Sequence, residues 1–540
     1  MISAKKISLG IVALCIASLA IPLNLANSPI AATSAYNWYQ VSANAPNNAT
    51  HIGVLESAIN VTYDTADAFQ AMNLIQMQVY PTSESTNDRE DYVMIVDMDG
   101  NVVNGYVQPG RGGQLQMINS TTVFFVDTVS GNFTLWNIYT NETEHTMAPS
   151  GHHDAEYNPE TETFMVIESV FVQGDYNWSG DVQPIKDDDI VEYDKNGNEI
   201  WRWNCSQTFP FEASEWLQRN ESRRGEIDWT HSNGVYWDIE ENAVYVSVRH
   251  LDCVVKIDYL TGGTVWVAGR YTGNGPALTM YNLAGEEVDT LYYHTHAVEL
   301  IGPNTLLLFD NDYWNLTRPN PEFDGISGYV EFTFDEDAMT ATESWTWRAP
   351  DIYYEESQGD AAILPNGNVL GAFNQNPRPI VTEVNREGEI VWEWIFEPTN
   401  HSGHTYGWGV SANGIMRFLE APAIVIDESS VGAALDMSVW EVTQFRWTTN
   451  GSVRILDDAV LLMEEDFEFL PHWQETPLSL VIPGLAAGEH ELTIEVENED
   501  GVVGSVNLTV TLVDNTLLYV GIVAGAAILV IVIIVYIKKK

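Results

Sequence analysis

Short apolar stretches in which every second residue is polar fill most of the chain between Asn60 and Asp514, separated by Gly, Asn and Asp. Alternation with a period of two places successive side chains on opposite faces, which is typical of half-buried β-strands. The apolar positions of this region show almost no helical period. The pattern therefore predicts an all-β protein whose short strands are joined by tight turns.

One phrase recurs six times: an apolar strand, a turn rich in Asp, Asn and Gly, and a strand that usually ends in Trp. A second type of hairpin lies between the copies, so each repeat has two hairpins and four strands. Four-stranded units repeated radially form a β-propeller, and we predict six blades over residues 75–418. An array of sandwiches is the alternative, but no separate linkers divide the copies. The six copies begin at Met94, Val123, Asp189, Val254, Gly328 and Ile380.

The repeat stops after Arg417, where a different pattern begins. The segment LSLVIPGLAAGEHELTIEVENEDGVVGSVNLTVTLV from Leu478 is similar to hairpins of an immunoglobulin-like sandwich. We predict that residues 419–514 form such a domain, separable from the propeller and acting as a stalk. Residues 36–74 would form an N-terminal extension.

The two ends of the chain predict an exported, membrane-anchored protein. Residues 1–35 have two lysines, then an apolar run, then small residues, which is the order of a secretory signal. Residues 517–537 carry no charge and are long enough to cross a bilayer as a helix. By the positive-inside rule, lysines 538–540 form a cytoplasmic tail. We therefore expect a single-pass protein of the cell membrane with an extracellular ectodomain.

Charge restricts the partners of this ectodomain. The chain has 23 Lys and Arg against 76 Asp and Glu, a net charge of −53, which repels nucleic acid and excludes it as a partner. Outside the predicted signal the cysteines are Cys205 and Cys253, which an exported protein could hold as a disulfide or as free thiols. Asn-x-Ser/Thr sequons, as glycosylation requires, all precede the predicted membrane helix. They begin at Asn48, Asn60, Asn119, Asn132, Asn141, Asn177, Asn204, Asn220, Asn315, Asn400, Asn450 and Asn507.

One predicted hairpin, with its turn at Glu240, gathers groups that bind anions. Paired residues of an antiparallel hairpin have numbers that sum to a constant, which places His231 opposite Arg249. The same rule places Asn233 opposite Ser247 on the same face. An imidazole, a guanidinium and an amide can all donate hydrogen bonds to a tetrahedral oxyanion. Alternatively, Arg249 pairs with a nearby carboxylate of this acidic chain.

Two further predicted strands open with histidine. In the first, a hairpin places His296 opposite Asp310, which could orient its imidazole. His152 and His153 open the corresponding strand of an earlier repeat. Because the first strand of each propeller blade lines the central channel, these histidines would converge with His231 on one funnel.

This set of residues resembles the bacterial aryl-sulfate sulfotransferases. The resemblance rests on HHD, then HSN with Arg eighteen residues after the histidine, then a strand-opening His before a hairpin that ends in FDN. The DxxGxxxW phrase of the repeats adds to it, and the resemblance spans residues 75–418. It implies a six-bladed propeller that moves a sulfuryl group from an aryl sulfate donor to a phenolic acceptor through a sulfated histidine. Neither a nucleotide donor nor a metal or other cofactor is implied.

The resemblance also implies roles for individual residues. The catalytic nucleophile would be His296, preceded by Thr295 where the family often has Gln, and Ser357 is the candidate for a further hydroxyl ligand. The N-terminal segment is too short for the sandwich through which the bacterial enzymes dimerise, although Gly521 and Gly525 would allow a homodimer through the membrane helix. Substrate binding would fall to His153 (with His152 as the other choice), His231, Asn233 and Arg249.

Two other functions fit the same residues. A non-catalytic surface propeller could bind a glycan or a protein and keep the histidines for packing. A metal-dependent hydrolase could bind zinc or copper, although Arg249 would repel the cation. The ligands would then be His231, His294, His296 and Asp310.

Overall fold

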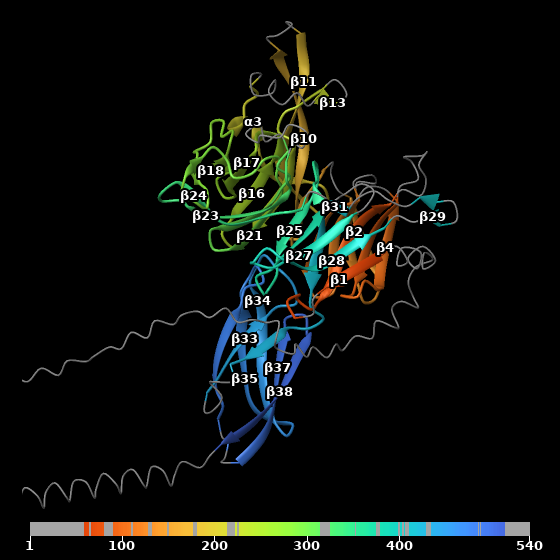
Figure 1. Ribbon diagram of the computed structural model, residues 1–540, viewed down its shortest axis with the longest axis vertical. Helices are drawn as coiled ribbons and strands as arrows, with labels where there is room; N and C mark the ends of the chain where they lie inside the picture. The colour runs from red at the N-terminus through yellow and green to blue at the C-terminus, as the bar shows by residue number, and fades with distance from the viewer. Residues whose placement is uncertain are drawn as a thin grey trace, which may run out of the picture.

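The computed structural model describes residues 59–63, 66–79, 90–109, 112–127, 132–147, 151–176, 181–212, 222–223, 226–313, 325–350, 353–373, 379–397, 400–401, 404–405, 410–427, 434–483, 485 and 488–512. The regular secondary structure of these residues is nearly all β-strand, which confirms the predicted all-β class (Figure 1). Helical turns described among them are α3 (Cys205–Thr208) and η2 (Arg249–Leu251). The predicted signal, membrane helix and cytoplasmic tail lie outside these residues. Within them, no helix has the length and apolar character needed to cross a membrane.

Among the described residues between 59 and 418, six sheets each contain four antiparallel strands in a row. In one of them, β31 (Val410–Phe418) pairs with β2 (Met72–Val79), which β3 (Glu90–Val96) and β4 (Val102–Pro109) follow. In the other five, the four strands are consecutive along the chain. They are β5 (Gly112–Asn119), β6 (Thr122–Asp127), β7 (Asn132–Asn137) and β8 (Thr143–Met147); β9 (Ala155–Asn158), β10 (Thr163–Tyr176), β11 (Asp181–Asp194) and β12 (Glu199–Trp203); β15 (Ser232–Asp238), β16 (Ala243–Val248), β17 (Cys253–Asp258) and β18 (Gly263–Gly269); β21 (His296–Gly302), β22 (Thr305–Asp310), β23 (Gly328–Asp335) and β24 (Thr340–Arg348); and β25 (Asp360–Ile363), β26 (Val369–Phe373), β27 (Ile380–Val384) and β28 (Ile390–Phe396).

Short strands extend three of these sheets. β1 (Ile59–Tyr63) pairs with β28, and β14 (Glu226–Asp228) joins β11 and carries β13 (Ser222–Arg223). β19 (Thr279–Tyr281) joins β24 and carries β20 (Glu287–Val288). A separate hairpin consists of β29 (Asn400–His401) and β30 (His404–Thr405).

The first strands of the six sheets contact one another in a closed order: β31, β5, β9, β15, β21, β25 and back to β31. The closing strand, β31, comes from near the end of this region and pairs with β2 near its beginning. Arg417 of β31 is fully buried; it donates to Asn73 at 2.7 Å and forms an ion pair with Glu383 of β27. The ring is therefore closed by pairing between its two chain ends and by an ion pair to a neighbouring sheet.

The recurring phrase has a direct structural reason. In its turns, the Asp97 carboxylate accepts hydrogen bonds from the backbone N–H groups of Asp99 and Asn101, and Asp194 binds Asn196 and Asn198 in the same way. The tryptophans near its end are buried between sheets, where a large aromatic side chain stabilises the packing most. They are Trp136, Trp203, Trp266, Trp347 and Trp394.

Two further sheets follow β31 and lie at one end of the molecule (Figure 1). One contains β32 (Ala423–Ile426), β33 (Ala434–Trp440) and β36 (Thr476–Val481), and the other contains β35 (Val460–Phe469), β34 (Thr449–Asp457), β37 (Gly488–Asn498) and β38 (Val503–Leu512). Leu435, Val453 and Ile494 belong to the core that the two sheets share. We call these sheets and their connections the C-terminal unit. Its assignment as an immunoglobulin-like stalk remains a prediction.

The C-terminal unit makes buried contacts with the ring, which the expectation of a separable domain did not anticipate. Arg446 forms an ion pair with Glu156 and a second one with Glu299 at 3.3 Å, and its guanidinium lies 4.1 Å from the ring centroid of Tyr236. His472 hydrogen-bonds the hydroxyl of Tyr236 at 2.5 Å. Together with residues of β5, β21, β25 and β31, Arg446 lines a cavity of about 40 Å³. The unit thus completes the interior of the ring at one end.

Candidate active site

The histidines and the amide predicted from the sequence gather at one end of the ring. Asn233 and His296 stand at the start of β15 and β21, and His153 lies two residues before β9. These three strands are neighbours in the ring, so their starting ends lie together. Glu156 and Glu299, which Arg446 contacts, lie further along β9 and β21. The candidate site and the C-terminal unit are therefore at opposite ends of the same strands.

The imidazole rings form a continuous cluster. Ring centroids are 5.0 Å apart for His153 and His231, 4.5 Å for His231 and His250, and 5.6 Å for His250 and His294. His153, His231 and His294 have φ angles of 62°, 48° and 53°. Non-glycine residues seldom adopt this left-handed conformation, and those that do are concentrated at functional sites.

The predicted hairpin is present with one irregularity. Ser232 pairs with Val248, as the predicted register requires, but the next pair is Gly234 with Ser247 because a β-bulge falls at Asn233. The Asn233 side chain still meets Ser247, whose hydroxyl donates to Oδ1 at 2.6 Å. Its Nδ2 donates to the carbonyl of Thr295 at 3.1 Å, which ties β15 to β21. An amide nitrogen donates hydrogen bonds, so Asn233 belongs to the groups that can bind an anion.

Arg249 is buried in the turn η2 and is held by neutral acceptors. Its Nη1 donates to Nε2 of His250 at 2.8 Å, and its Nη2 donates to the carbonyl of Glu356 at 3.3 Å. His250 in turn donates from Nδ1 to the carbonyl of Asp228 at 2.8 Å, which fixes its tautomer. These two contacts fix the orientation of the guanidinium, and a fixed guanidinium is the kind of group that binds an anion. His250 was not predicted, and its adjacency to Arg249 was the available signal.

The predicted partner of His296 is wrong. A β-bulge after His296 pairs it with Phe309, while the carboxylate of Asp310 forms an ion pair with Arg348 at 2.5 Å. Nδ1 of His296 instead lies 2.6 Å from Oδ1 of Asn311. The bulge shifts the register by one residue, which pattern alternation alone does not reveal.

The orientation of Asn311 determines which nitrogen of His296 carries the proton. Nδ2 of Asn311 donates to the carbonyls of Glu355 at 2.9 Å and Gln358 at 2.7 Å, so Oδ1 is the atom that faces the imidazole. An amide oxygen accepts hydrogen bonds, and therefore Nδ1 of His296 is protonated and Nε2 carries the lone pair. Burial and the charge of Arg249 lower the pKa of His296 to about 3. The ring is thus a neutral imidazole with a nucleophilic Nε2 at ordinary pH.

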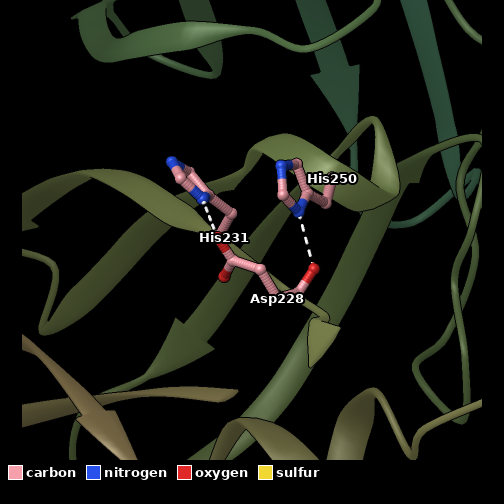
Figure 2. Close-up of side chains that lie close together, drawn as sticks. All are labelled: Asp228, His231 and His250. Carbon is pink, nitrogen blue, oxygen red and sulfur yellow. Dashed lines mark hydrogen bonds and ion pairs between the residues drawn. The ribbon is translucent and has the colours of Figure 1, made fainter. Parts of the chain in front are cut away.

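Asp228, His231 and His250 lie close enough together to bind a metal ion, and Figure 2 shows both rings turned toward Asp228. His231 donates from Nδ1 to the Asp228 carboxylate at 2.6 Å. However, Arg249 donates to Nε2 of His250, and the ammonium of Lys186 lies 3.5 Å from the Asp228 carboxylate. Two cations beside the cluster favour an anion over a metal ion.

The metal ligands predicted for a hydrolase included Asp310. In the structure Asp310 is instead paired with Arg348, so the predicted ligand set is not the group of residues that lies together. The pKa of His231 is well below its usual value because of burial, with further effects from His250 and Arg249. His231 is therefore a neutral imidazole whose Nδ1 proton is committed to Asp228.

Other residues named from the sequence have local roles. The Thr295 hydroxyl donates to the carbonyl of Phe309 at 2.8 Å. The backbone N–H of Ser357 donates to the Glu355 carboxylate at 3.0 Å, next to the carbonyls that hold Asn311. Cys205 and Cys253 are both buried free thiols.

Comparison with known proteins adds a family. Residues 60–387, more than half of the 540 residues, match the family model described as Arylsulfotransferase (ASST). A search of curated proteins gives no match. Among solved structures, a protein of unknown function from Bacteroides caccae is 10% identical over 60% of this chain and 93% of that chain, with a TM-score of 0.31. The Cps50 (Swd1) β-propeller domain from Myceliophteria thermophila is 12% identical over 60% of this chain and 100% of that chain, with a TM-score of 0.32.

The family match agrees with the motifs that carry the resemblance in the sequence. HHD, HSN and the downstream Arg all fall within residues 60–387, as does the strand that opens with His296. The chain belongs to the arylsulfotransferase (ASST) family.

Proposed function

We propose that this protein transfers a sulfuryl group from an aryl sulfate to a phenol through a covalent intermediate on Nε2 of His296. The observation that carries the proposal is the hydrogen-bond chain from two carbonyls through Asn311 to Nδ1 of His296. It leaves a neutral imidazole with its lone pair on the other nitrogen. Six sheets whose first strands contact one another in closed order support a six-bladed propeller as the scaffold.

In the first step, the Nε2 lone pair attacks sulfur, the bond from sulfur to the aryl oxygen breaks, and its electron pair leaves on the phenolate. Arg249 and Asn233 would hold the sulfuryl oxygens, since both can donate whatever the protonation state of the site. His231 can donate to a sulfuryl oxygen only as an imidazolium, because its Nδ1 proton is committed to Asp228. The guanidinium and the amide are therefore the principal donors.

In the second step, the acceptor oxygen attacks sulfur and the bond from sulfur to Nε2 breaks. During the lifetime of the intermediate, Nδ1 keeps its proton, so the sulfated ring carries a positive charge and Nε2 is a good leaving group. Asn311 is neutral and does not offset that charge, whereas a carboxylate in its place would stabilise the intermediate. The electron pair returns to Nε2 and restores the starting imidazole. Every group in these steps comes from the chain itself.

The ends of the chain support a location for this reaction. An uncharged segment at residues 517–537 and the lysines after it favour a single-pass anchor in the cell membrane, with the propeller outside the cell. The donor and the acceptor would then be extracellular phenols and their sulfate esters. The GxxxG pair in this segment supports a homodimer as a further proposal.

The test is to follow sulfur from a labelled aryl sulfate into the full-length protein. We expect an acid-labile label on the peptide that contains His296, and ping-pong kinetics with a second phenol. His296→Asn should abolish both label and transfer, whereas the control His294→Asn should keep the label. Label on His153 or His231 would contradict the assignment of the nucleophile. The absence of both label and transfer with aryl sulfates would favour a non-catalytic binding propeller.

A further inference from the structure

His152, which has no role in the site described so far, connects His153 to the buried carboxylate of Asp188. Nε2 of His152 lies 2.9 Å from Oδ1 of Asp188, and Nδ1 of His152 lies 2.5 Å from Nδ1 of His153. From this geometry we propose that Asp188, His152 and His153 form a proton relay, which takes the proton of the acceptor phenol and returns it to the departing phenolate. The inference rests on the proposed sulfuryl transfer and assigns its acid–base chemistry.

The carboxylate end of the relay is fixed. Asp188 is fully buried and accepts hydrogen bonds from the backbone N–H of Ser232 at 2.7 Å and from the Thr230 hydroxyl at 3.2 Å. The ammonium of Lys186 lies 3.6 Å away. Burial alone would raise the pKa of Asp188, but His152 and Lys186 outweigh it and hold the pKa below its usual value. An ionised carboxylate only accepts, and therefore Nε2 of His152 carries a proton.

The relay then has two states that differ by one proton. In the state without the extra proton, Nδ1 of His152 carries a lone pair, so His153 donates to it from Nδ1 and presents a lone pair at Nε2. In the state with the extra proton, His152 is an imidazolium that donates from both nitrogens, and His153 presents an N–H at Nε2. The two hydrogen bonds persist in both states. Only the character of His153 Nε2 changes, from acceptor to donor.

These states match the two steps of transfer. When the acceptor oxygen bonds to sulfur and the bond to Nε2 of His296 breaks, the phenol proton passes to Nε2 of His153. The Nδ1 proton of His153 moves to His152, and the positive charge comes to lie beside Asp188. In the next turnover, the reverse movement delivers that proton to the oxygen of the departing phenolate. No proton is gained or lost over the cycle.

The backbone around His153 supports a fixed position for its ring. His153 has a left-handed φ of 62°, and its neighbours are tied down on both sides. The N–H of His152 donates to the carbonyl of Ile167 at 2.9 Å, and the N–H of Asp154 donates to the carbonyl of His152 at 2.8 Å. The backbone that carries the His153 ring is therefore held in place at the relay.

The competing base is His231, whose Nδ1 also meets a carboxylate, that of Asp228. Its ring lies against His250, and the charges of Arg249 and Lys186 oppose its protonation. A charge on His152 would also form beside a carboxylate, that of Asp188, which is fully buried. The ionisable groups that face the relay are Asp188, Lys186, Asp228 and His231.

Asp188→Asn tests the relay sharply. The new amide can donate to Nε2 of His152, which moves the His152 proton to Nδ1 and leaves His153 as a permanent donor at Nε2. We expect transfer from the sulfated enzyme to unsubstituted phenol to slow by roughly 10²- to 10⁴-fold, the usual contribution of general acid–base catalysis. Transfer to a nitrophenol that is already ionised should change by less than about 5-fold, as should the burst of nitrophenolate from a nitrophenyl sulfate.

Two further variants complete the design. Asp187→Asn makes the same change at the neighbouring buried carboxylate and should leave the ratio of the two acceptors as in wild type. His152→Gln should reproduce the effect of Asp188→Asn. Because His152 is partly exposed, this variant can replace Asp188→Asn in the test if the Asp188→Asn protein does not fold. Equal slowing of both acceptors, or acceptor discrimination in Asp228→Asn but not in Asp188→Asn, would overturn the relay.

A readout independent of turnover separates failure of the relay from failure of the proposed function. In the full-length protein with ¹⁵N-labelled histidine, ring nitrogen shifts should report His152 protonated at Nε2 in wild type and at Nδ1 in Asp188→Asn. An unchanged tautomer would overturn the relay even if the enzyme is active. The absence of any burst from aryl sulfates in wild type would reject sulfuryl transfer, and with it the role of the relay.

Discussion

The Oδ1 atom of Asn311 lies 2.6 Å from Nδ1 of His296, and two backbone carbonyls hold the amide in that orientation. The relationship places the nucleophilic lone pair on the opposite nitrogen. We predict that Asn311→Leu, which keeps the bulk but removes the acceptor, lowers kcat by roughly 10²- to 10⁴-fold through loss of the correct tautomer. Steady-state kinetics with a nitrophenyl sulfate provide the measurement. Wild-type kcat in a folded Asn311→Leu protein would show that the tautomer is set elsewhere.

Arg249→Lys should cost about 2–4 kcal/mol in transition-state stabilisation, the scale of losing one preorganised donor. Lysine keeps the charge but lacks the planar fork that can hold two sulfuryl oxygens and also donate to His250. The kcat/KM for the donor gives this value directly, and thermal unfolding checks the fold. Turnover equal to that of wild type would mean that Arg249 does not touch the sulfuryl group.

The pKa of His296 makes a prediction about acid stability. Its folded value of about 3 lies below the ordinary 6.5, so between these pH values the unfolded chain binds a proton that the folded chain does not. As the pH is lowered through this window, the free energy of unfolding should therefore decrease, by about 1.4 kcal/mol per pH unit for this residue. Above 6.5 neither state is protonated and the dependence should vanish.

The measurement is the difference in unfolding free energy between wild type and His296→Gln, followed from pH 7 downward by urea titration. Taking the difference removes the opposite contribution of Asp154 and Asp360, whose pKa values burial raises to about 7. Those carboxyls are protonated first in the folded state, and they stabilise it as the pH falls. A difference that does not change with pH would mean that His296 is protonated in the folded enzyme.

Arg446→Met should destabilise the protein by about 3–5 kcal/mol, because it leaves Glu156 and Glu299 buried without their cation. The control is Arg454→Met within the C-terminal unit, where a partly exposed ion pair with Glu495 should be worth about 0–1 kcal/mol. Denaturant unfolding of both variants gives the comparison. Equal losses would indicate that the contact between ring and C-terminal unit contributes little.

The recurring phrase predicted the sheets well because its Trp and Asp positions have local causes, a buried ring and a turn that binds its own backbone. The closing strand β31 lies outside the six copies. Its partner β2 is more than 300 residues away, and no local sequence pattern predicts that pairing. The rule that paired residues of a hairpin have numbers with a constant sum was right at Ser232 and Val248. It failed at Asn233 and His296, where bulges insert a residue.

Residues that act through another side chain were harder to predict from the sequence. Asp188 stands in a run of three aspartates that the alternation does not distinguish from solvated charge, yet it is fully buried beside His152. The contact of Arg446 with Glu156 joins positions 290 residues apart. Pattern analysis predicts which face of an element is buried, but it does not predict which distant side chain meets it.

The position of Arg446 also constrains the order of events in the reaction. Its side chain and that of Trp473 line the cavity inside the ring, on the side away from the candidate histidines, and they would hinder a phenol from leaving the site in that direction. The donor and the acceptor would then have to enter the site through the same opening. If the site holds one phenol at a time, the first phenol has to leave before the second can reach sulfur. A ring closed at its far end would then favour the proposed covalent intermediate, because the sulfuryl group stays on the protein while the phenols exchange.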